Sequence, residues 1–225
     1  MTQRKLLASA RHIVVEGPIG VGKTSLARRL AEHLDADTLL EQPEANPFLA
    51  RFYQNRQRYA LQTQLFFLFQ RLDQMRDMAQ PDLFPRTVIS DYLMEKELLF
   101  ASLTLSEDDY RLYRQIYDRV SQQAGAAPDL VIYLRASVPT LLKRIALRNR
   151  DYERSIEPAY LDHLNSLYEN WITHFTLCPV LTVPADELDY VAHTQHLELI
   201  ISKVKEKLTG KEEVIFTREE ANTPD

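Results

Sequence analysis

The sequence predicts an α/β protein, in which a parallel sheet of five strands is flanked by helices on both faces. Five short apolar segments alternate with longer segments whose apolar residues recur at spacings of three and four. Strands and helices that alternate in this way form a parallel sheet that is buried on both sides. The chain has 225 residues, of which 45% are hydrophobic, so we expect one domain over 1–209 and a polar, flexible tail over 210–225.

The expected strands and helices follow one another with short connections. Strands are expected at 12–15, 38–40, 87–90, 129–134 and 180–183. A helix follows the first strand, and further helices are expected at 48–53, 59–78, 92–103, 106–123, 137–148, 157–175 and 190–208. Ser106 suits a helix N-cap because its hydroxyl can accept a backbone N–H, and Pro139 suits the first turn of a helix because it has no N–H to lose.

A glycine-rich loop joins the first strand to the first helix. Its residues are Gly17-Pro18-Ile19-Gly20-Val21-Gly22-Lys23-Thr24-Ser25, which is Gly, four residues, then Gly-Lys-Thr. In such a P-loop, backbone N–H groups surround the β-phosphate of a nucleotide, the lysine reaches the β- and γ-phosphates, and the threonine hydroxyl can ligate Mg²⁺. The alternative, a glycine-rich turn with a solvated lysine, does not explain why a strand precedes the loop and a helix follows it. We therefore expect a nucleoside triphosphate site.

Two acidic residues come directly after expected strands. Glu41 follows the strand at 38–40, and Asp91 follows the strand at 87–90. Ligands of open parallel sheets bind at the carboxyl ends of the strands. Beside a γ-phosphate, Glu41 can deprotonate or orient an attacking hydroxyl, which is worth roughly 10²- to 10⁴-fold in rate. Its alternative is a solvated loop acid. Asp91 suits a contact with Lys23 or with a Mg²⁺-bound water, and equally a helix N-cap; both roles can hold at once.

Three arginines lie close together late in the chain. Arg144, Arg148 and Arg150 fall where the helix at 137–148 gives way to a short polar stretch. A mobile arginine that supplies positive charge to a migrating phosphoryl group is worth roughly 10³- to 10⁵-fold in rate. The three residues therefore suit a lid that closes on the phosphates. The alternative is a solvated basic face paired with Asp151 and Glu153.

Charge and composition limit the possible partners and compartment. The net charge of −5 and the pI near 5.7 disfavour nucleic acid, because duplex-binding surfaces carry excess basic charge. The one cysteine, Cys178, cannot form an internal disulfide, which fits a reducing compartment. No apolar run approaches the roughly 18 residues that span a bilayer, and residues 1–9 lack the hydrophobic region of a signal peptide. We expect a cytoplasmic protein with no membrane partner.

Taken in order, these segments resemble the deoxyribonucleoside kinase family, particularly its bacterial deoxyadenosine and deoxyguanosine kinases, from about His12 to Leu208. The matching segments are the P-loop with Glu16 before it, Glu41 ahead of Asn46-Pro47-Phe48-Leu49, Gln64 with Arg71 on one helix, Ser90-Asp91-Tyr92, and Arg144 through Arg150 with Glu153. The ordered set is far more specific than any one member. The resemblance implies a P-loop kinase fold with an arginine-rich lid.

The resemblance also implies roles for individual residues. Glu41 matches the general base that acts on the sugar 5′-hydroxyl, and Gln64 matches the amide that pairs with the base. Tyr53 and Glu153 match the pair that holds the 3′-hydroxyl, and Phe100 resembles the ring that stacks on the base. Arg144, Arg148 and Arg150 match the lid arginines.

One departure from the family concerns the residues after the middle strand. Many members carry an acid followed by Arg-Ser, whereas this chain has Asp91-Tyr92-Leu93. Another cation must complete that side of the site, and Arg71 is the first candidate. Arg71, Tyr92, Lys96 and Glu97 would all lie near the purine edge, so the preferred base stays open.

The sequence thus predicts an enzyme that uses ATP and Mg²⁺ to phosphorylate the 5′-hydroxyl of a deoxyribonucleoside, a purine in preference. One rival is a nucleoside monophosphate kinase of the thymidylate kinase type, which must bind the phosphate of its acceptor. Between Glu41 and Tyr53, however, there is one basic residue, Arg51, against two acids. A rival of another class is a non-enzymatic nucleotide-binding switch, which needs no general base. The resemblance further implies a homodimer joined through long helices, and 59–78 is apolar on more than one face.

Overall fold

The computed structural model describes residues 12–78, 86–123, 127–208 and 215–217. Its strands are β1 (His12–Glu16), β2 (Asp37–Leu39), β3 (Val88–Ser90), β4 (Leu130–Arg135) and β5 (Val180–Pro184). They form one parallel sheet in the order β2-β3-β1-β4-β5. Ile13 of the central strand β1 is paired with Ile89 on one side and with Leu130 on the other. The predicted sheet of five parallel strands is confirmed.

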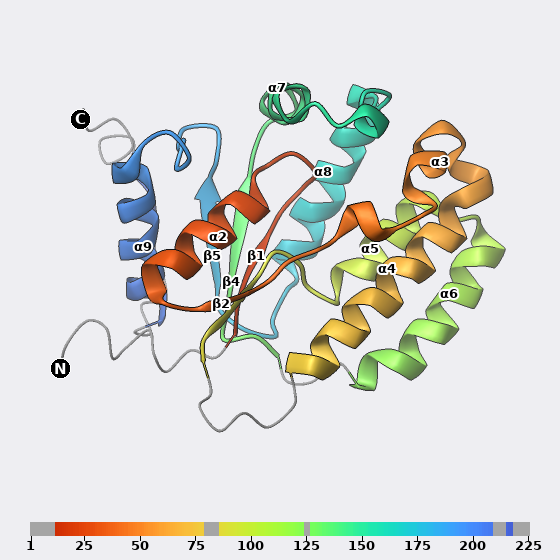
Figure 1. Ribbon diagram of the computed structural model, residues 1–225, viewed down its shortest axis with the longest axis horizontal. Helices are drawn as coiled ribbons and strands as arrows, with labels where there is room; N and C mark the ends of the chain where they lie inside the picture. Colours follow the sequence, from red (N-terminus) through yellow and green to blue (C-terminus); the bar gives the residue numbers. More distant parts are fainter. Residues whose placement is uncertain (1–11, 79–85, 124–126, 209–214, 218–225) are drawn as a thin grey trace.

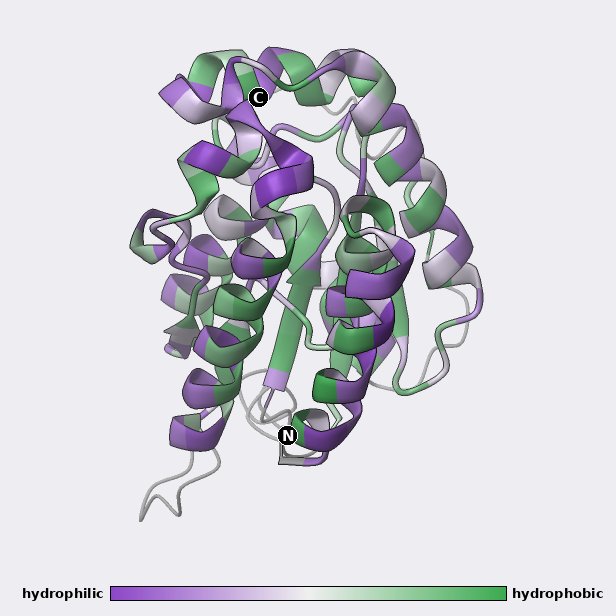
Figure 2. Ribbon diagram, turned by 90° about the vertical axis from the view of Figure 1, so that its right-hand side faces the viewer, coloured by the Kyte–Doolittle hydropathy of each residue, from purple (hydrophilic) through white to green (hydrophobic). Residues whose placement is uncertain are grey.

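Helices cover both faces of this sheet. They are α2 (Lys23–Leu34), α3 (Leu49–Gln54), α4 (Arg56–Met78), α5 (Lys96–Thr104), α6 (Glu107–Val120), α7 (Val138–Arg148), α8 (Pro158–Thr173) and α9 (Thr194–Leu208), with short 3₁₀ turns η1 (Pro43–Ala45), η2 (Ser121–Gln123) and η3 (Asp151–Glu153). On one face, α2 packs on β1 and β3, and α9 packs on β5. On the other, Val14 and Val131 pack against Trp171 of α8. Figure 2 shows apolar strands between helices whose ribbons alternate hydrophilic and hydrophobic residues.

A second apolar cluster lies beside the sheet. It joins α4, α5 and α6, which stand together with α3 on the right of Figure 1, and its core includes Leu68, Leu72, Ala101 and Tyr113. Ser106 caps α6 by accepting a hydrogen bond from the Asp109 N–H, as the sequence predicts. Helix α4 contacts the segment after β2 through Arg71 and Glu41, and α5 contacts the end of β1 through Lys96 and Glu16, so this helical unit and the P-loop line one cavity.

Three helices begin three or four residues away from the position that the apolar spacing predicts. Helix α4 starts at Arg56 because the side chain of Asn55 accepts the Arg58 N–H. Helix α5 starts at Lys96, four residues later than expected, because the Leu93 N–H is bound by the Glu16 carboxylate.

The last helix likewise starts late, at Thr194, because the Asp189 carboxylate accepts the N–H groups of Val191 and Ala192 and holds a turn there. Of the expected tail at 210–225, only 215–217 falls within the described residues; Phe216 there packs against the main core. Within the described ranges, no helix is long and apolar enough to cross a bilayer.

Candidate active site

A cavity of about 910 Å³ lies at the carboxyl ends of the strands. Its walls are formed by the P-loop and the start of α2, the segment after β2, helices α3, α4 and α5, helix α7 with η3, and the loop after β5. Small-molecule sites generally occupy about 300 to 1,000 Å³. One space thus contacts nearly all of the segments that the sequence singles out.

The P-loop forms one side of this cavity, from Ile19 to Ser25. Gly17 and Pro18 are not among the residues that line the cavity. Their carbonyl oxygens accept hydrogen bonds from Lys23 Nζ at 2.8 and 3.2 Å. Gly22 has a φ of +105°, and a Cβ there would collide with the Tyr190 hydroxyl, so only glycine fits. Burial and the nearby Lys96 ammonium lower the pKa of Lys23 to about 8, although neighbouring acids oppose this. Lys23 therefore keeps its charge at neutral pH.

The Thr24 hydroxyl and the Asp91 carboxylate lie next to each other beside the P-loop. The Thr24 hydroxyl donates a hydrogen bond of 2.5 Å to Asp91 Oδ2, and Asp91 Oδ1 accepts the Glu41 N–H at 2.7 Å. Burial and the adjacent Glu41 raise the pKa of Asp91, whereas its hydrogen bonds lower it. Asp91 does not cap a helix, since α5 begins five residues later. A hydroxyl beside a carboxylate is the oxygen chemistry that Mg²⁺ prefers, so these residues fit the ion.

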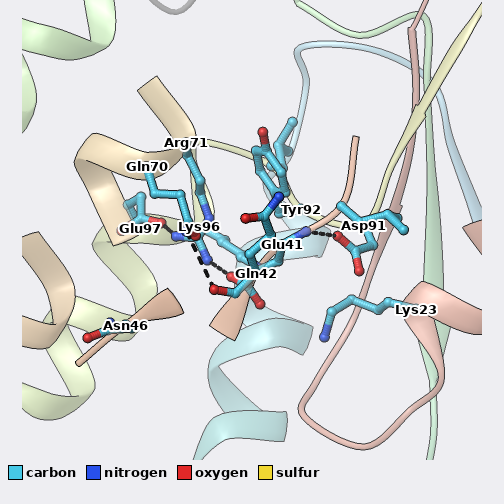
Figure 3. A network of polar contacts seen from close by, with 12 residues as sticks. Lys23, Glu41, Gln42, Asn46, Gln70, Arg71, Asp91, Tyr92, Lys96 and Glu97 are labelled. Atoms are coloured by element: carbon cyan, nitrogen blue, oxygen red, sulfur yellow. Dashed lines mark hydrogen bonds and ion pairs between the residues drawn. The ribbon is translucent and has the colours of Figure 1, made fainter. Parts of the chain in front are cut away.

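Glu41 lies between the P-loop and α4, as Figure 3 shows. Its carboxylate pairs with Arg71 of α4 and lies 3.9 Å from Lys96 Nζ. Helix α4 also fixes the backbone on either side, because Gln74 donates to the Leu40 carbonyl and Gln70 donates to the Gln42 carbonyl. The segment after β2 is thereby held in one position against α4.

Opposing effects act on the ionisation of Glu41. Burial raises the pKa of its carboxyl group, but Lys96, Arg71 and Lys23 lower it, so that it falls to about 2. The side chain is 21% exposed, on the cavity side. Glu41 is therefore an ionised carboxylate that points into the space beside the P-loop, and it can accept a hydrogen bond from a hydroxyl there.

The far end of the cavity has apolar and amide groups. Gln64 and Phe100 both contact this end, and the Gln64 amide donates to the Thr104 hydroxyl at 3.1 Å. Tyr53 and Glu153 meet across the opening between α3 and η3, where burial and then nearby groups including Glu153 raise the pKa of Tyr53 well above its ordinary value. The structure thus brings these four sequence-predicted residues to one end of the same space.

The three arginines contact the cavity from the side of α7 and η3. Arg144 donates to the carbonyl oxygens of Val21 and Ala185, both at 2.7 Å, so it contacts the P-loop itself. Arg148 makes a two-pronged pair with Glu153, at 2.6 and 3.0 Å. Arg150 reaches Glu44 of η1 at 2.6 Å and so bridges the opening of the cavity. All three are paired with protein groups.

Tyr92 and Glu97 are placed differently from what the sequence suggests. Both are buried, and neither is among the residues that line the cavity. Glu97 pairs with Arg71 and accepts a hydrogen bond of 2.6 Å from Tyr113, while the Tyr92 ring lies 5.4 Å from the Arg71 guanidinium carbon. They form a layer behind Arg71 because the turn at 92–95 directs them into the α4–α5–α6 cluster instead of toward the open space.

Comparison with known proteins gives consistent results. The family model of deoxynucleoside kinases matches residues 13–209. A deoxyguanosine kinase of Bacillus subtilis is 38% identical over 203 residues, which is 88% of this chain and 98% of the relative. The structure of a deoxyadenosine kinase from M. mycoides with bound dATP superimposes with a TM-score of 0.76, at 26% identity, over 86% of this chain and 98% of that one. The chain belongs to the deoxynucleoside kinase family.

Membership of this family makes the chain a phosphotransferase that phosphorylates the 5′-hydroxyl of a deoxynucleoside with ATP. The predicted P-loop kinase fold is confirmed by the same comparisons. The thymidylate kinase type and the non-enzymatic switch, which the sequence leaves as rivals, gain no support. A second relative from Bacillus subtilis, 29% identical over 196 residues, is a deoxyadenosine/deoxycytidine kinase, so relatives of this chain differ in the base they accept.

Sequence reasoning does not predict the contacts of three residues of the site. Glu16 and Lys96 form a buried ion pair of 3.3 Å beside the P-loop, and Tyr190 hydrogen-bonds to the P-loop backbone. One signal was available for Lys96, because it is the one basic residue of a mostly apolar helix. No comparable signal exists for Tyr190, which lies in a connecting loop.

Proposed function

We propose that the chain transfers the γ-phosphate of ATP to the 5′-hydroxyl of a purine deoxynucleoside, with Glu41 as the general base. The observation that carries this proposal is that Glu41 faces Lys23 across one cavity, which continues to Gln64 and Phe100. A phosphate donor at the P-loop and a nucleoside at α4 and α5 would then meet at the Glu41 carboxylate. At the α4 end the basic lining residues Arg71 and Lys96 are both paired with carboxylates, which favours an uncharged acceptor.

The reaction follows from these positions. Lys23 binds the β- and γ-phosphates, and the Thr24 hydroxyl, with Asp91 beside it, would hold Mg²⁺. Bound Mg²⁺ supplies positive charge to the β- and γ-phosphate oxygens. Glu41 accepts a hydrogen bond from the 5′-hydroxyl and orients it in line with the γ-phosphorus. Because the pKa of Glu41 is low, the proton moves only as the new P–O bond forms, which suits a loose transition state.

The arginines act as a lid in this proposal. Arg148 and Arg150 exchange their carboxylate partners for phosphate oxygens as the nucleotide binds, while Arg144 holds the P-loop and its phosphates from the side of α7. Glu153, once released from Arg148, holds the sugar 3′-hydroxyl together with Tyr53. Gln64 pairs with the base, Phe100 stacks on it, and Arg71 lies at its edge, supported from behind by Tyr92 and Glu97.

A purine acceptor is supported by relatives, since deoxyguanosine and deoxyadenosine kinases are among them. The test is ADP production from MgATP in the presence of each of the four deoxynucleosides in turn. We expect ADP production to depend on the nucleoside, with kcat/KM higher for the two purines. If no nucleoside changes the rate of ATP hydrolysis, the proposed kinase activity is refuted. If kcat/KM is higher for a pyrimidine deoxynucleoside, the proposed purine preference is refuted.

We also propose a homodimer joined through the long helices. Phe69 of α4 and Leu112 of α6 are large apolar side chains, and about half of each is exposed. Helices α4 and α6 pack against each other, so a partner on this side would cover both. Sedimentation of the parent and of Phe69→Glu tests this: we expect a dimer that the substitution dissociates. The cytoplasmic location expected from the sequence stays a prediction.

A further inference from the structure

Lys96 occupies a position between two acids at the inner end of the cavity. It is the first residue of α5, and its side chain is only 3% exposed. Its Nζ lies 3.3 Å from Glu16 Oε1, 3.9 Å from Glu41 Oε1 and 5.9 Å from the centroid of the Phe100 ring. Figure 3 shows it beside Glu41 and Arg71. Lys96 therefore connects the acid before the P-loop to the acid after β2.

Glu16 holds Lys96 from the side of the P-loop. Its carboxylate is fully buried and accepts hydrogen bonds from the N–H groups of Gly17 and Leu93, both at 2.9 Å, and from the Tyr168 hydroxyl at 3.1 Å. Three donors satisfy most of the hydrogen-bonding capacity of the carboxylate, so its position is fixed. The Lys96 ammonium is fixed in turn, because its nearest acid does not move.

Arg71 alone does not balance the charge on this side of the site. The sequence makes Arg71 the first candidate for the missing cation, but Arg71 pairs with Glu97 as well as with Glu41. Glu16, Glu41 and Glu97 are thus three buried or half-buried carboxylates whose salt bridges are made with two cations, Arg71 and Lys96. Without Lys96, the buried Glu16 carboxylate would lose its salt bridge and Glu41 would share Arg71 with Glu97. Burying a carboxylate without a paired cation is strongly unfavourable.

We propose that Lys96 is a positioning residue for phosphoryl transfer: anchored by Glu16, it holds the Glu41 carboxylate in place and aimed at the acceptor hydroxyl. The inference rests on the proposed role of Glu41. The groups that face Glu41 are Lys23 of α2, Arg71 of α4, Lys96 of α5 and Asp91 after β3. Lys23 and Arg71 have further tasks in the proposed reaction, toward the phosphates and the base. Lys96 is the cation whose partners stay the same when substrates bind.

Three variants test this role in the full chain. Lys96→Met keeps the length of the side chain and removes its charge, whereas Lys96→Arg keeps the charge. Lys203→Met is the matched control, because Lys203 is the other buried lysine of the described ranges and lies on α9, outside the cavity lining. We expect Lys96→Met to lower kcat by roughly 10-fold or more, with both KM values within about 3-fold of the parent. Lys96→Arg should keep more activity, and Lys203→Met should match the parent.

The split between kcat and KM, together with rescue by Lys96→Arg, is a readout that a purely structural role would not move. Loss of the Lys96 ammonium should leave the Glu41 carboxylate less firmly held beside the acceptor, so kcat should fall while substrate affinity stays the same. KM values that rise as much as kcat falls, or a Lys96→Arg variant as impaired as Lys96→Met, would overturn the proposal.

A double variant separates folding from catalysis, because Lys96→Met also leaves Glu16 without its cation. In Glu16→Gln/Lys96→Met both charges disappear together. We expect this variant to regain thermal stability without regaining kcat; recovery of both would mean that Lys96 only neutralises Glu16. The parent is assayed alongside. A parent without nucleoside-dependent ADP production refutes the proposed function itself, whereas an active parent with an equally active Lys96→Met refutes only the role of Lys96.

Discussion

The Tyr190 hydroxyl lies 3.1 Å from the carbonyl oxygen of Val21 and 3.2 Å from that of Gly22, so the loop after β5 holds the P-loop from behind. Tyr190 is 2% exposed. Along the chain it is far from Val21 and Gly22, so the fold brings these residues together. Arg144 donates to the same Val21 oxygen from α7. The P-loop conformation therefore depends on two segments that follow it by more than a hundred residues.

We expect Tyr190→Phe to weaken ATP binding roughly 2- to 10-fold, because a backbone that loses a hydrogen bond of about 1 kcal/mol is less well arranged for phosphate. Nucleoside binding should not change. Tyr133→Phe is the matched control, since the Tyr133 hydroxyl donates to Glu169, which is outside the cavity lining. Calorimetric titration with a non-hydrolysable ATP analogue measures the difference. Equal ATP affinities in the two variants would contradict the prediction.

The lid proposal predicts that Arg148→Lys lowers kcat by roughly 10-fold or more and raises the KM for ATP by less than about 3-fold. Lysine keeps the charge but loses the planar group that now binds both oxygens of Glu153 and would span two phosphate oxygens. Arg154→Lys serves as the control, because Arg154 is exposed and pairs with Asp151. Steady-state kinetics with ATP varied gives both constants. Equal losses in binding and turnover would instead indicate a general electrostatic effect.

The parts of the site that the sequence predicts are those set by local patterns. Nine consecutive residues define the P-loop, and the rule that ligands bind at the carboxyl ends of parallel strands brings Glu41 and Asp91 beside it. Both predictions need only the strand positions, which apolar segments such as 130–134 make plain. The five-stranded sheet follows from the same alternation.

The parts that the sequence does not predict depend on packing between distant segments. Lys96 reaches the P-loop only because the Leu93 N–H is bound by Glu16, which delays the start of α5 and turns this lysine inward. Tyr190 would have been the first residue of a helix if Asp189 had not formed a turn with the residues after it. Neither contact follows from apolar spacing, because each depends on one carboxylate that competes for backbone N–H groups.

Gln64→Ala should weaken nucleoside binding by about 1 to 3 kcal/mol, because a polar base edge is left unpaired in a desolvated pocket, while ATP binding stays the same. Gln64 is 5% exposed, and its amide also donates to Thr104. Thr104→Val therefore controls for loss of that internal hydrogen bond. Titration with deoxyguanosine and with deoxyadenosine compares the two variants. A loss in Thr104→Val as large as that in Gln64→Ala would assign the effect to local structure.

His12 predicts a pH dependence of stability. Burial lowers the pKa of His12 to about 4, against a smaller raising effect of Asp129, whereas in the unfolded chain the pKa is about 6.5. Below about pH 6.5 the His12 side chain is protonated in the unfolded chain but stays neutral in the folded chain until about pH 4. The free energy of unfolding therefore decreases as the pH falls toward 4. The difference amounts to about 2 kcal/mol at about pH 5. Urea unfolding of the parent and of His12→Gln between about pH 7.5 and 5 should show a steeper decline in the parent. Parallel curves would contradict this.

The central claim is that Glu41 takes the proton from a deoxynucleoside hydroxyl, and single-turnover phosphorylation by Glu41→Gln tests it most directly. Glutamine keeps the size and the hydrogen-bonding reach of the side chain but does not accept the proton. The control is Glu32→Gln, an exposed acid of α2 that does not line the cavity. With saturating MgATP and deoxyguanosine, we expect the rate of monophosphate formation in Glu41→Gln to fall by roughly 10² or more, with nucleoside affinity within about 3-fold of the parent. A Glu41→Gln rate within about 3-fold of the Glu32→Gln rate would contradict the account.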